Sequence, residues 1–334
     1  MTVTTDAPSA APTRVPPTGR SWRRIGLRVA GRLVAAAVVV WAVVTFTFFA
    51  VRAVPGDPVT AILGGPGSNA SEEAIAQARA DFGLDRPLGQ QYLNYLGQLL
   101  RGDLGESYRL HRDVADVVGQ LVPGTLALAS LALVLGWFFA LGLAWWSVRG
   151  GRGSALAADF IGIIASALPH FWLGALLISL LATGLGLPVA ISGPGFGGLI
   201  VPALTLALPL GGYLAQVMRD ALVATLEEPY VLAARARGET RAGVFLRHLL
   251  RRAAVPAIGL TGWAFGSLVS GAVVVEQLFA RPGLGRALVD AVLARDVPMV
   301  QGVLIVVAVA YVVVTLATDV LERAVLPPAK EARA

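Results

Sequence analysis

Cysteine is absent from this 334-residue chain, and so is a recognisable loop for nucleotide hydrolysis. The absence of thiols excludes disulfides, zinc–thiolate sites and cysteine catalysis together, and only three histidines remain for metal chemistry. No stretch fits Gly-x-x-x-x-Gly-Lys-Ser/Thr, the loop that cradles nucleotide phosphates, since the sole lysine is Lys330. We therefore expect no metal site, no bound cofactor and no ATP hydrolysis in this chain itself.

Charged residues are also scarce, at 14%, whereas 56% of the residues are hydrophobic and the mean hydropathy is +0.70. A soluble domain of this length needs less apolar material, so the composition indicates a membrane protein. The net charge of +6 suits a nucleic-acid ligand, but nucleic-acid-binding domains do not devote over half of their residues to apolar runs. We expect no nucleic-acid partner and interpret the arginines as topology signals beside membrane lipid.

Six apolar stretches are long enough to cross a bilayer as helices, because about 30 Å of hydrocarbon needs roughly 20 residues at about 1.5 Å each. They occupy residues 33–54, 125–148, 160–187, 199–222, 255–279 and 300–321. Transmembrane β-strands instead show alternating apolar and polar residues in segments of about ten residues. The sequence therefore predicts an all-α membrane protein with six transmembrane helices, which form the domain 33–322. The first stretch exceeds the core of a cleaved signal peptide, and we expect it to be retained.

Arginines cluster before the first stretch, after the second and after the fourth, at residues 14–32, 149–152 and 219–252. The positive-inside rule places these regions in the cytoplasm, and the uncharged connection 184–198 on the outer side. Both termini are then cytoplasmic. We expect residues 1–32 to be a disordered basic tail and residues 323–334 to be a second tail.

An extracytoplasmic insertion, residues 55–124, separates the first two helices and is too long for a simple link. Residues 54–58, Val-Pro-Gly-Asp-Pro, form a turn that must end the first helix. Ser71 is placed to cap a helix that begins at Glu72, and a second, amphipathic helix is predicted over residues 87–100. The insertion is either a cap on the bundle or a docking surface for an external substrate-delivery protein.

A cytoplasmic loop, residues 223–254, joins the fourth and fifth helices and carries the most informative motif. Pro229 fits the first turn of a short helix, the acids before it suit a helix start, and Gly238 can end the helix in a left-handed cap. Its small alanines allow close approach of another surface. Such a helix either seats in a groove of a partner protein or lies on the membrane with its arginines against anionic lipid.

Residues Ala233-Ala234 followed by Gly238 resemble the Glu-Ala-Ala-x-x-x-Gly signature of ABC importer permeases, and residues 230–238 look like its dipeptide/oligopeptide/nickel branch. Further motifs are similar to that branch in matching order over residues 33–322: VPGDP at 54–58, GLDRP at 83–87, RGDLG at 101–105, PHFWLG at 169–174, RPGLG at 281–285 and RDVP at 295–298. Two departures stand out. Leu232 replaces the glutamate of the general signature, and the later Ile-x-Leu-Pro spacing is not met, since the nearest proline is Pro256.

The resemblance implies the permease subunit of an ATP-driven, binding-protein-dependent importer in a bacterial plasma membrane. This chain would form half of the translocation pathway beside a second permease, as a heterodimer. Two cytoplasmic ATPase subunits would hold ATP and Mg²⁺, and an extracytoplasmic lipoprotein would deliver di- or oligopeptides. The segment 228–238 would be a coupling helix that enters a cleft on one ATPase. Its coupling residues would be Glu228, Tyr230, Val231, Ala233, Ala234, Arg235, Ala236, Arg237 and Gly238.

The alternative is an ion-coupled secondary transporter that acts without an ATPase and carries ionisable groups inside its bundle. His170 lies well inside a predicted helix, where packing explains it better than proton transfer does. Glu276, near the outer end of the fifth helix, is the candidate substrate contact, through a peptide amine, unless it pairs with Arg281. A membrane-embedded enzyme is a more distant third reading, because no Gly-x-Ser-x-Gly elbow occurs.

Overall fold

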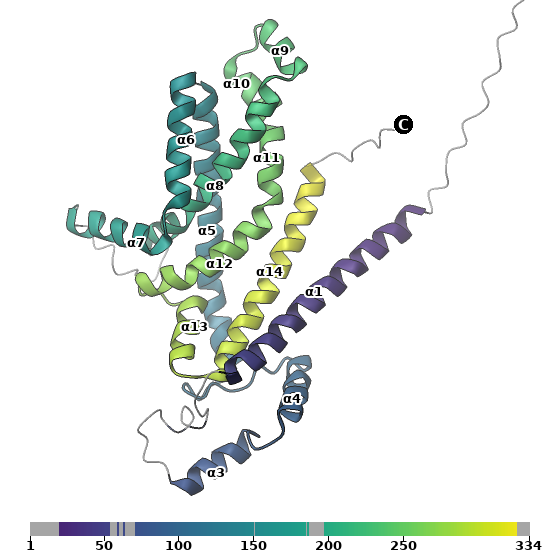
Figure 1. Cartoon of the computed structure of the whole chain (residues 1–334), viewed down its shortest axis with the longest axis vertical. Coiled ribbons are helices and arrows are strands. Elements are labelled where there is room, and N and C mark those ends of the chain that lie inside the picture. The colour runs from purple at the N-terminus through teal and green to yellow at the C-terminus, as the bar shows by residue number, and fades with distance from the viewer. Residues whose placement is uncertain are drawn as a thin grey trace, which may run out of the picture.

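The computed structural model describes residues 20–53, 59, 63, 71–149, 151–184, 186 and 197–325. Regular secondary structure in these ranges is helical, as expected (Figure 1). The elements are α1 (Arg20–Ala53), α3 (Glu72–Asp81), α4 (Leu88–Leu100), α5 (Val114–Arg149), α6 (Arg152–Ala167), α7 (His170–Ile178), the π-helical turn η1 (Ser179–Gly184), the 3-10 turn η2 (Gly197–Leu199), α8 (Ile200–Leu226), α9 (Pro229–Ala236), α10 (Arg241–Val244), the π-helical turn η3 (Phe245–Leu249), α11 (Leu250–Gly259), α12 (Thr261–Leu278), α13 (Leu284–Leu293) and α14 (Val297–Val325).

Four helical segments are individually long and apolar enough to cross a membrane: Ala30–Ala53, Val114–Arg149, Gly197–Leu226 and Val297–Thr318. Each of two bent helix pairs meets the same condition when its two helices are taken together. The first joins Arg152–Ala167 to His170–Ala182, and the second joins Arg252–Gly259 to Thr261–Leu278. If each bent pair is one span, the described chain has six spans, which is the expected number.

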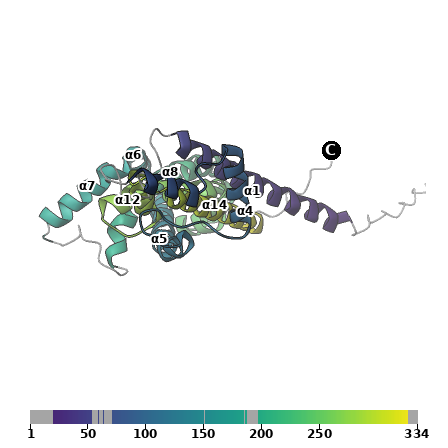
Figure 2. The same cartoon turned by 90° about the horizontal axis from the view of Figure 1, so that it is seen from below.

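The third predicted span, residues 160–187, is not one straight helix, and this part of the prediction is wrong. Helix α6 ends at Ala167 and the chain turns by 101° into α7. Leu168 is extended because the following Pro169 disfavours helical backbone and lacks an N–H donor. Figure 2 shows the result from below: α7 and α1 leave the bundle on opposite sides.

Helix boundaries at the N-terminal side also differ from the prediction. Residues 20–32, expected to be disordered, belong to α1, since they contain no proline and are rich in arginine, a good helix former. Helix α5 begins at Val114, so the insertion ends earlier than residue 124. Residues 1–19 of the expected tail and the turn at 54–58 lie outside the described residues.

Glycines allow α5, α6 and α8 to pack backbone against backbone. A Cβ atom on Gly211 of α8 would lie 2.6 Å from the carbonyl oxygen of Gly136 in α5. One on Gly212 would lie 2.6 Å from the carbonyl oxygen of Gly162 in α6. Small residues at such crossings replace side-chain interdigitation with direct helix contact, as is usual between membrane helices. This three-helix contact forms the centre of the apolar core.

Two helices and a loop of the insertion lie at one end of the bundle, which we call the insertion end (Figure 1). Ser71 Oγ accepts the N–H of Ala74, so the predicted cap of α3 is confirmed, and α4 matches the second predicted helix. Tyr92 of α4 bonds Thr45 of α1 at 2.6 Å. The loop before α5 is tied to the start of α14, because the buried Asp296 carboxylate accepts hydrogen bonds from the Ser107 hydroxyl and the Tyr108 and Arg109 N–H groups. The insertion is thus anchored on both α1 and α14.

Candidate functional site

The candidate coupling segment folds as its sequence predicts. Pro229 is the first residue of α9 and needs no N–H there, while Glu228 is the extended residue before it. At the other end Gly238 has φ of +83°, and its N–H donates to the carbonyl of Arg235 at 3.0 Å. The N–H of Glu239 donates to the carbonyl of Ala234 at 3.2 Å. These two bonds form a Schellman cap, so the predicted short helix and its glycine stop are confirmed.

The two sides of α9 differ sharply in exposure. Val231 and Ala234, three residues apart, are fully buried and join the main apolar core. Glu228 and Tyr230 are half-buried beside them. The remaining predicted coupling residues are exposed, and they are Ala233, Arg235, Ala236, Arg237 and Gly238. The predicted set therefore divides into an inner pair that holds the helix to its own chain and an outer surface open to a partner.

Polar contacts also fasten α9 to the segment that leads into α12. The Arg252 guanidinium lies 5.2 Å from the centre of the Tyr230 ring and 3.9 Å from the Glu228 carboxylate. Just after the cap, Glu239 contacts His248 at 3.0 Å and Arg247 at 3.4 Å. The hydrogen bond with His248 is the main reason that the pKa of the Glu239 carboxyl lies below its usual value. These contacts attach α9 and its cap to η3 and α11.

Sequence reasoning missed three features of this site. Leu232 departs from the signature, yet its side chain is 52% exposed on the outer surface of α9. Arg252 contacts Tyr230 of α9, and His248 contacts Glu239 just after its cap. No local pattern links Arg252 or His248 to a helix about 20 residues earlier in the chain. The exposure of Leu232 had no local signal either, since single exposed apolar side chains are common on protein surfaces.

Helix α9 and the insertion lie at opposite ends of the molecule (Figure 1). Helices α1 and α14 both run from the insertion end toward the end that carries α9, so the Arg20 end of α1 and the Val325 end of α14 lie away from the insertion. This arrangement agrees with a membrane that separates the insertion from α9.

Glu276, the predicted substrate contact, is 1% exposed and already bonded. Its Oε1 accepts the Thr125 hydroxyl at 2.6 Å, and its Oε2 accepts the N–H groups of Gly285 at 2.8 Å and Arg286 at 3.1 Å. The carboxylate thus sits at the N-terminus of α13, where the helix dipole favours a negative charge. Asp159, another acid within the helices, pairs with Arg219 of α8. Both acids are engaged in structural contacts.

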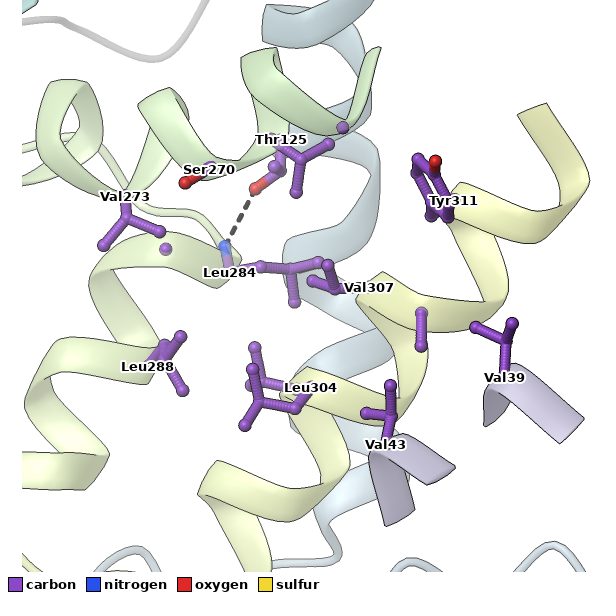
Figure 3. Close-up of a pocket in the computed structure, with 15 residues that line it drawn as sticks. Val39, Val43, Thr125, Ser270, Val273, Leu284, Leu288, Leu304, Val307 and Tyr311 are labelled. Carbon is purple, nitrogen blue, oxygen red and sulfur yellow. Dashed lines mark hydrogen bonds between the residues drawn. The ribbon is translucent and has the colours of Figure 1, made fainter. Parts of the chain in front are cut away.

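An apolar cavity of about 380 Å³ lies between α1, α5, α12, α13 and α14 (Figure 3). Val39 and Val43 of α1 border one side, and Leu288 of α13 lies across from them. Thr125, Ser270 and Tyr311 bring hydroxyl groups to a lining that is otherwise apolar. A second, more open cavity of about 550 Å³ lies on the His170 side of α12 and shares Gly266, Ser270 and Tyr311 with the first. The middle of α12 thus borders a cavity on each of two sides.

Comparison with protein families identifies two matching family models that together cover most of the chain. Residues 132–330 match "Binding-protein-dependent transport system inner membrane component". Residues 27–129 match the N-terminal family model, "Binding-prot-dependent transport system membrane comp, N-term". The boundary between the two matches falls within α5.

Several named proteins are similar along most of their length. The glutathione transport system permease protein of Escherichia coli O6:H1 is 34% identical over 283 residues, which cover 84% of this chain and 91% of that protein. Its counterpart in Salmonella choleraesuis is 33% identical over 287 residues, covering 85% and 92%. A protein of Brucella suis biovar 1, named provisionally as a peptide transport system permease, is 34% identical over 305 residues, covering 87% and 94%.

Among solved structures, an inward-facing conformation of the MetNI methionine ABC transporter shares the fold. The TM-score is 0.52 and the identity 20%, over 63% of this chain and 97% of that one.

Proposed function

Because this chain belongs to the family of binding-protein-dependent transport system inner membrane components, we propose that it is the permease half of an ATP-driven peptide importer. The chain is a transport component of the membrane and not a catalytic subunit. The observation that carries the proposal is α9: a capped short helix whose inner pair is buried in its own chain and whose outer surface is open.

In this proposal α9 is the coupling helix that enters a cleft of an ATPase subunit. The exposed side of Leu232, Ala233, Ala236 and Gly238 is small and apolar enough to seat closely, and Arg235 and Arg237 add positive charge around it. The Tyr230–Arg252 and Glu239–His248 contacts then pass movement to α11 and α12. Rigid attachment at these points favours motion of the spans as bodies, which alternating access requires.

The orientation follows from the same assignment. The α9 end and both termini face the cytoplasm of a bacterium, where two ATPase subunits hold ATP and Mg²⁺. The insertion faces outward, where a substrate-binding lipoprotein docks, and a second permease completes the pathway as a heterodimer. The arginine clusters at residues 149–152 and 219–252 support this orientation, since the junction of α5 and α6 and the connection from α8 to α11 lie toward the α9 end (Figure 1).

The cargo that we propose is a short peptide. The relatives named for glutathione and peptide transport support this class, and the cavity beside Ser270 and Tyr311 offers hydroxyl groups without a fixed charge. Helix α12 would line the pathway, where its two cavities meet. Contact of Glu276 with a peptide amine stays a prediction, and it requires the carboxylate to leave the N-terminus of α13.

Purification of the tagged chain in mild detergent from its native membrane tests the proposal. We expect a second permease and an ATPase to co-purify, with vanadate-sensitive ATP hydrolysis that a peptide-loaded binding protein stimulates. A matched preparation of the variant Ala236→Glu should retain the second permease and lose the ATPase. A chain that brings no ATPase, yet accumulates peptide in liposomes under an ion gradient, would contradict the proposal and establish the secondary transporter instead.

A further inference from the structure

A polar cavity lies where the insertion meets the ends of α1 and α14, at the opposite end of the molecule from α9. Its volume is about 250 Å³, the space of roughly eight water molecules at about 30 Å³ each. Its walls come from α1, the end of α3, α4, the 82–86 and 104–108 loops and the start of α14. Polar and charged side chains dominate this lining, in contrast to the cavity beside Val39 and Val43.

Two side chains in this cavity carry buried hydrogen-bonding atoms that have no partner among the described residues. They are the Nε2 amide of Gln301, a residue that is 4% exposed, and the hydroxyl of Tyr95. A buried donor without an acceptor is costly, so both atoms need an acceptor that the described residues do not supply, either water or a ligand that accepts hydrogen bonds. Burial raises the pKa of Tyr95, so its hydroxyl stays protonated and able to donate.

A guanidinium group is held in the same cavity by the insertion. Arg52 Nε and Nη2 both donate to Gln91 Oε1 at 3.3 Å, and Nη1 donates to the Phe48 carbonyl at 3.2 Å. Gln91 in turn donates to the carbonyls of Leu84 and Arg86, which fixes its acceptor toward Arg52. Three of the five N–H groups of the guanidinium are thus used by described residues, and its orientation is set before any ligand arrives.

The charge of the lining favours an anion. The lining contains two cations, Arg52 and Arg86, and one anion, Asp81, which is exposed. Arginine with neutral amide and hydroxyl donors is the combination that binds carboxylates in proteins. The cavity volume suits a ligand of the size of an amino acid or a dipeptide.

We propose that this cavity binds the carboxylate of a small free solute, with Arg52, Tyr95 and Gln301 as the donors. A short peptide has such a carboxylate at its C-terminus, and its ammonium group would meet Asp81 at the rim. The binding site follows from the cavity alone, whereas its use by the peptide cargo rests on the proposed function. At the insertion end, such a site would hold a peptide before it enters the path beside α12.

Calorimetric titration of the complete transporter, without its binding protein, tests the site in phosphatidylcholine nanodiscs. The probes are dialanine and its C-terminal amide, which differ in the carboxylate alone. We expect dialanine to bind and the amide to bind about ten- to hundred-fold more weakly, the range for a hydrogen bond to a charged group. Phosphatidylserine in the nanodiscs should leave the dialanine affinity unchanged, and competition by this lipid would overturn the assignment to a free solute.

Matched variants separate binding from folding. Tyr95→Phe and Gln301→Leu remove atoms that have no described partner, so both should keep or raise thermal stability while weakening dialanine about tenfold or more. Tyr92→Phe is the control, because the Tyr92 hydroxyl bonds Thr45 outside the cavity. This control should lose stability and keep the affinity for dialanine.

Equal affinity for dialanine and its amide, or unchanged affinity in both Tyr95→Phe and Gln301→Leu, would overturn the inference. ATP-driven uptake in proteoliposomes separates this failure from failure of the proposed function. If peptide is taken up but dialanine and its amide bind equally, only the proposed carboxylate site is wrong. If dialanine binds more tightly than its amide but no ATP-driven peptide uptake occurs, the site is supported and the proposed importer function is wrong.

Discussion

Thr125 of α5 donates a 2.6 Å hydrogen bond to the Glu276 carboxylate of α12, across 151 residues of sequence. The same hydroxyl oxygen accepts the N–H of Leu284 at 2.8 Å (Figure 3). Glu276 also accepts the N–H groups of Gly285 and Arg286. These bonds join three helices at one buried point, where α5 and α12 meet the N-terminus of α13.

Replacement of Glu276 should separate its structural role from a role in cargo binding. Glu276→Ala leaves buried N–H donors without an acceptor, which costs about 1–3 kcal/mol of folding stability for each donor. We therefore expect a clear drop in thermal stability in detergent. Glu276→Gln keeps the shape and an acceptor oxygen and should cost less. If Glu276 also binds a peptide amine, the Gln variant will fold and yet lose peptide uptake. Normal uptake by a stable Gln variant would remove the predicted cargo contact.

Replacement by glutamate should disturb the fold at one alanine of α9 and only partner binding at another. Ala234→Glu places a charge in the apolar core and should dislodge α9 from its own chain, since Ala234 is fully buried. Ala236 is exposed, so Ala236→Glu should leave the fold intact and block ATPase binding. Co-purification of the ATPase and protease sensitivity of the 223–254 loop are the measurements. Ala76→Glu, on exposed α3 at the insertion end, is the control and should change neither.

Gly238 should be needed for its backbone conformation and not for space. A Cβ atom at this position would meet no other atom within 4 Å, but φ is +83°, so Gly238→Ala should cost about 1–2 kcal/mol of local stability. Gly238→Pro forces φ negative and removes the N–H that closes the cap, so it should abolish coupled ATP hydrolysis while membrane insertion persists. Gly97→Ala, an ordinary helical glycine, is the control. Full coupling in the Pro variant would argue against α9 as the coupling helix.

The Glu239–His248 contact should give the cytoplasmic loop an acid-sensitive stability. The pKa of Glu239 is lowered in the folded state from its ordinary value of 4.5, so its ionised form stabilises the fold above that value. This stability is lost as the pH falls through the lowered pKa. The melting temperatures of the native chain and Glu239→Gln should therefore differ at about pH 5 and converge in more acidic buffer. A difference that grows with acidity would contradict this account.

Gly211 should tolerate no side chain, because a Cβ there would lie 2.6 Å from the Gly136 carbonyl oxygen. Gly211→Ala should separate α5 from α8 at a cost of about 1–3 kcal/mol, the usual penalty of overpacking. Gly142→Ala is the matched control in α5, since nothing lies within 4 Å of its Cβ position. Yield and thermal stability of the two variants in detergent give the comparison. Equal stability of both would show that α5 and α8 can move apart at little cost.

Local features were predictable where one segment of sequence contained the whole cause. Apolar runs long enough for a bilayer predicted the four helical segments that can each cross a membrane, since that requirement depends only on length and hydropathy. Pro229 and Gly238 predicted the two ends of α9 because proline and glycine act on their own backbone. Ser71 predicted the cap of α3 for the same reason.

Local sequence did not determine how much each side of these elements is covered. Ala233 and Ala234 are adjacent alanines, yet only the packing of α9 against its own chain makes one exposed and the other buried. The 101° turn after α6 needed more than Pro169, because proline also occurs inside continuous α8. By itself, therefore, the sequence determined the membrane class, the four unbroken spans and the ends of short helices. Tertiary structure decided that Glu276 caps α13 and that Arg52 meets Tyr95 and Gln301 in one cavity, since burial and hydrogen-bond partners depend on segments far apart in the chain.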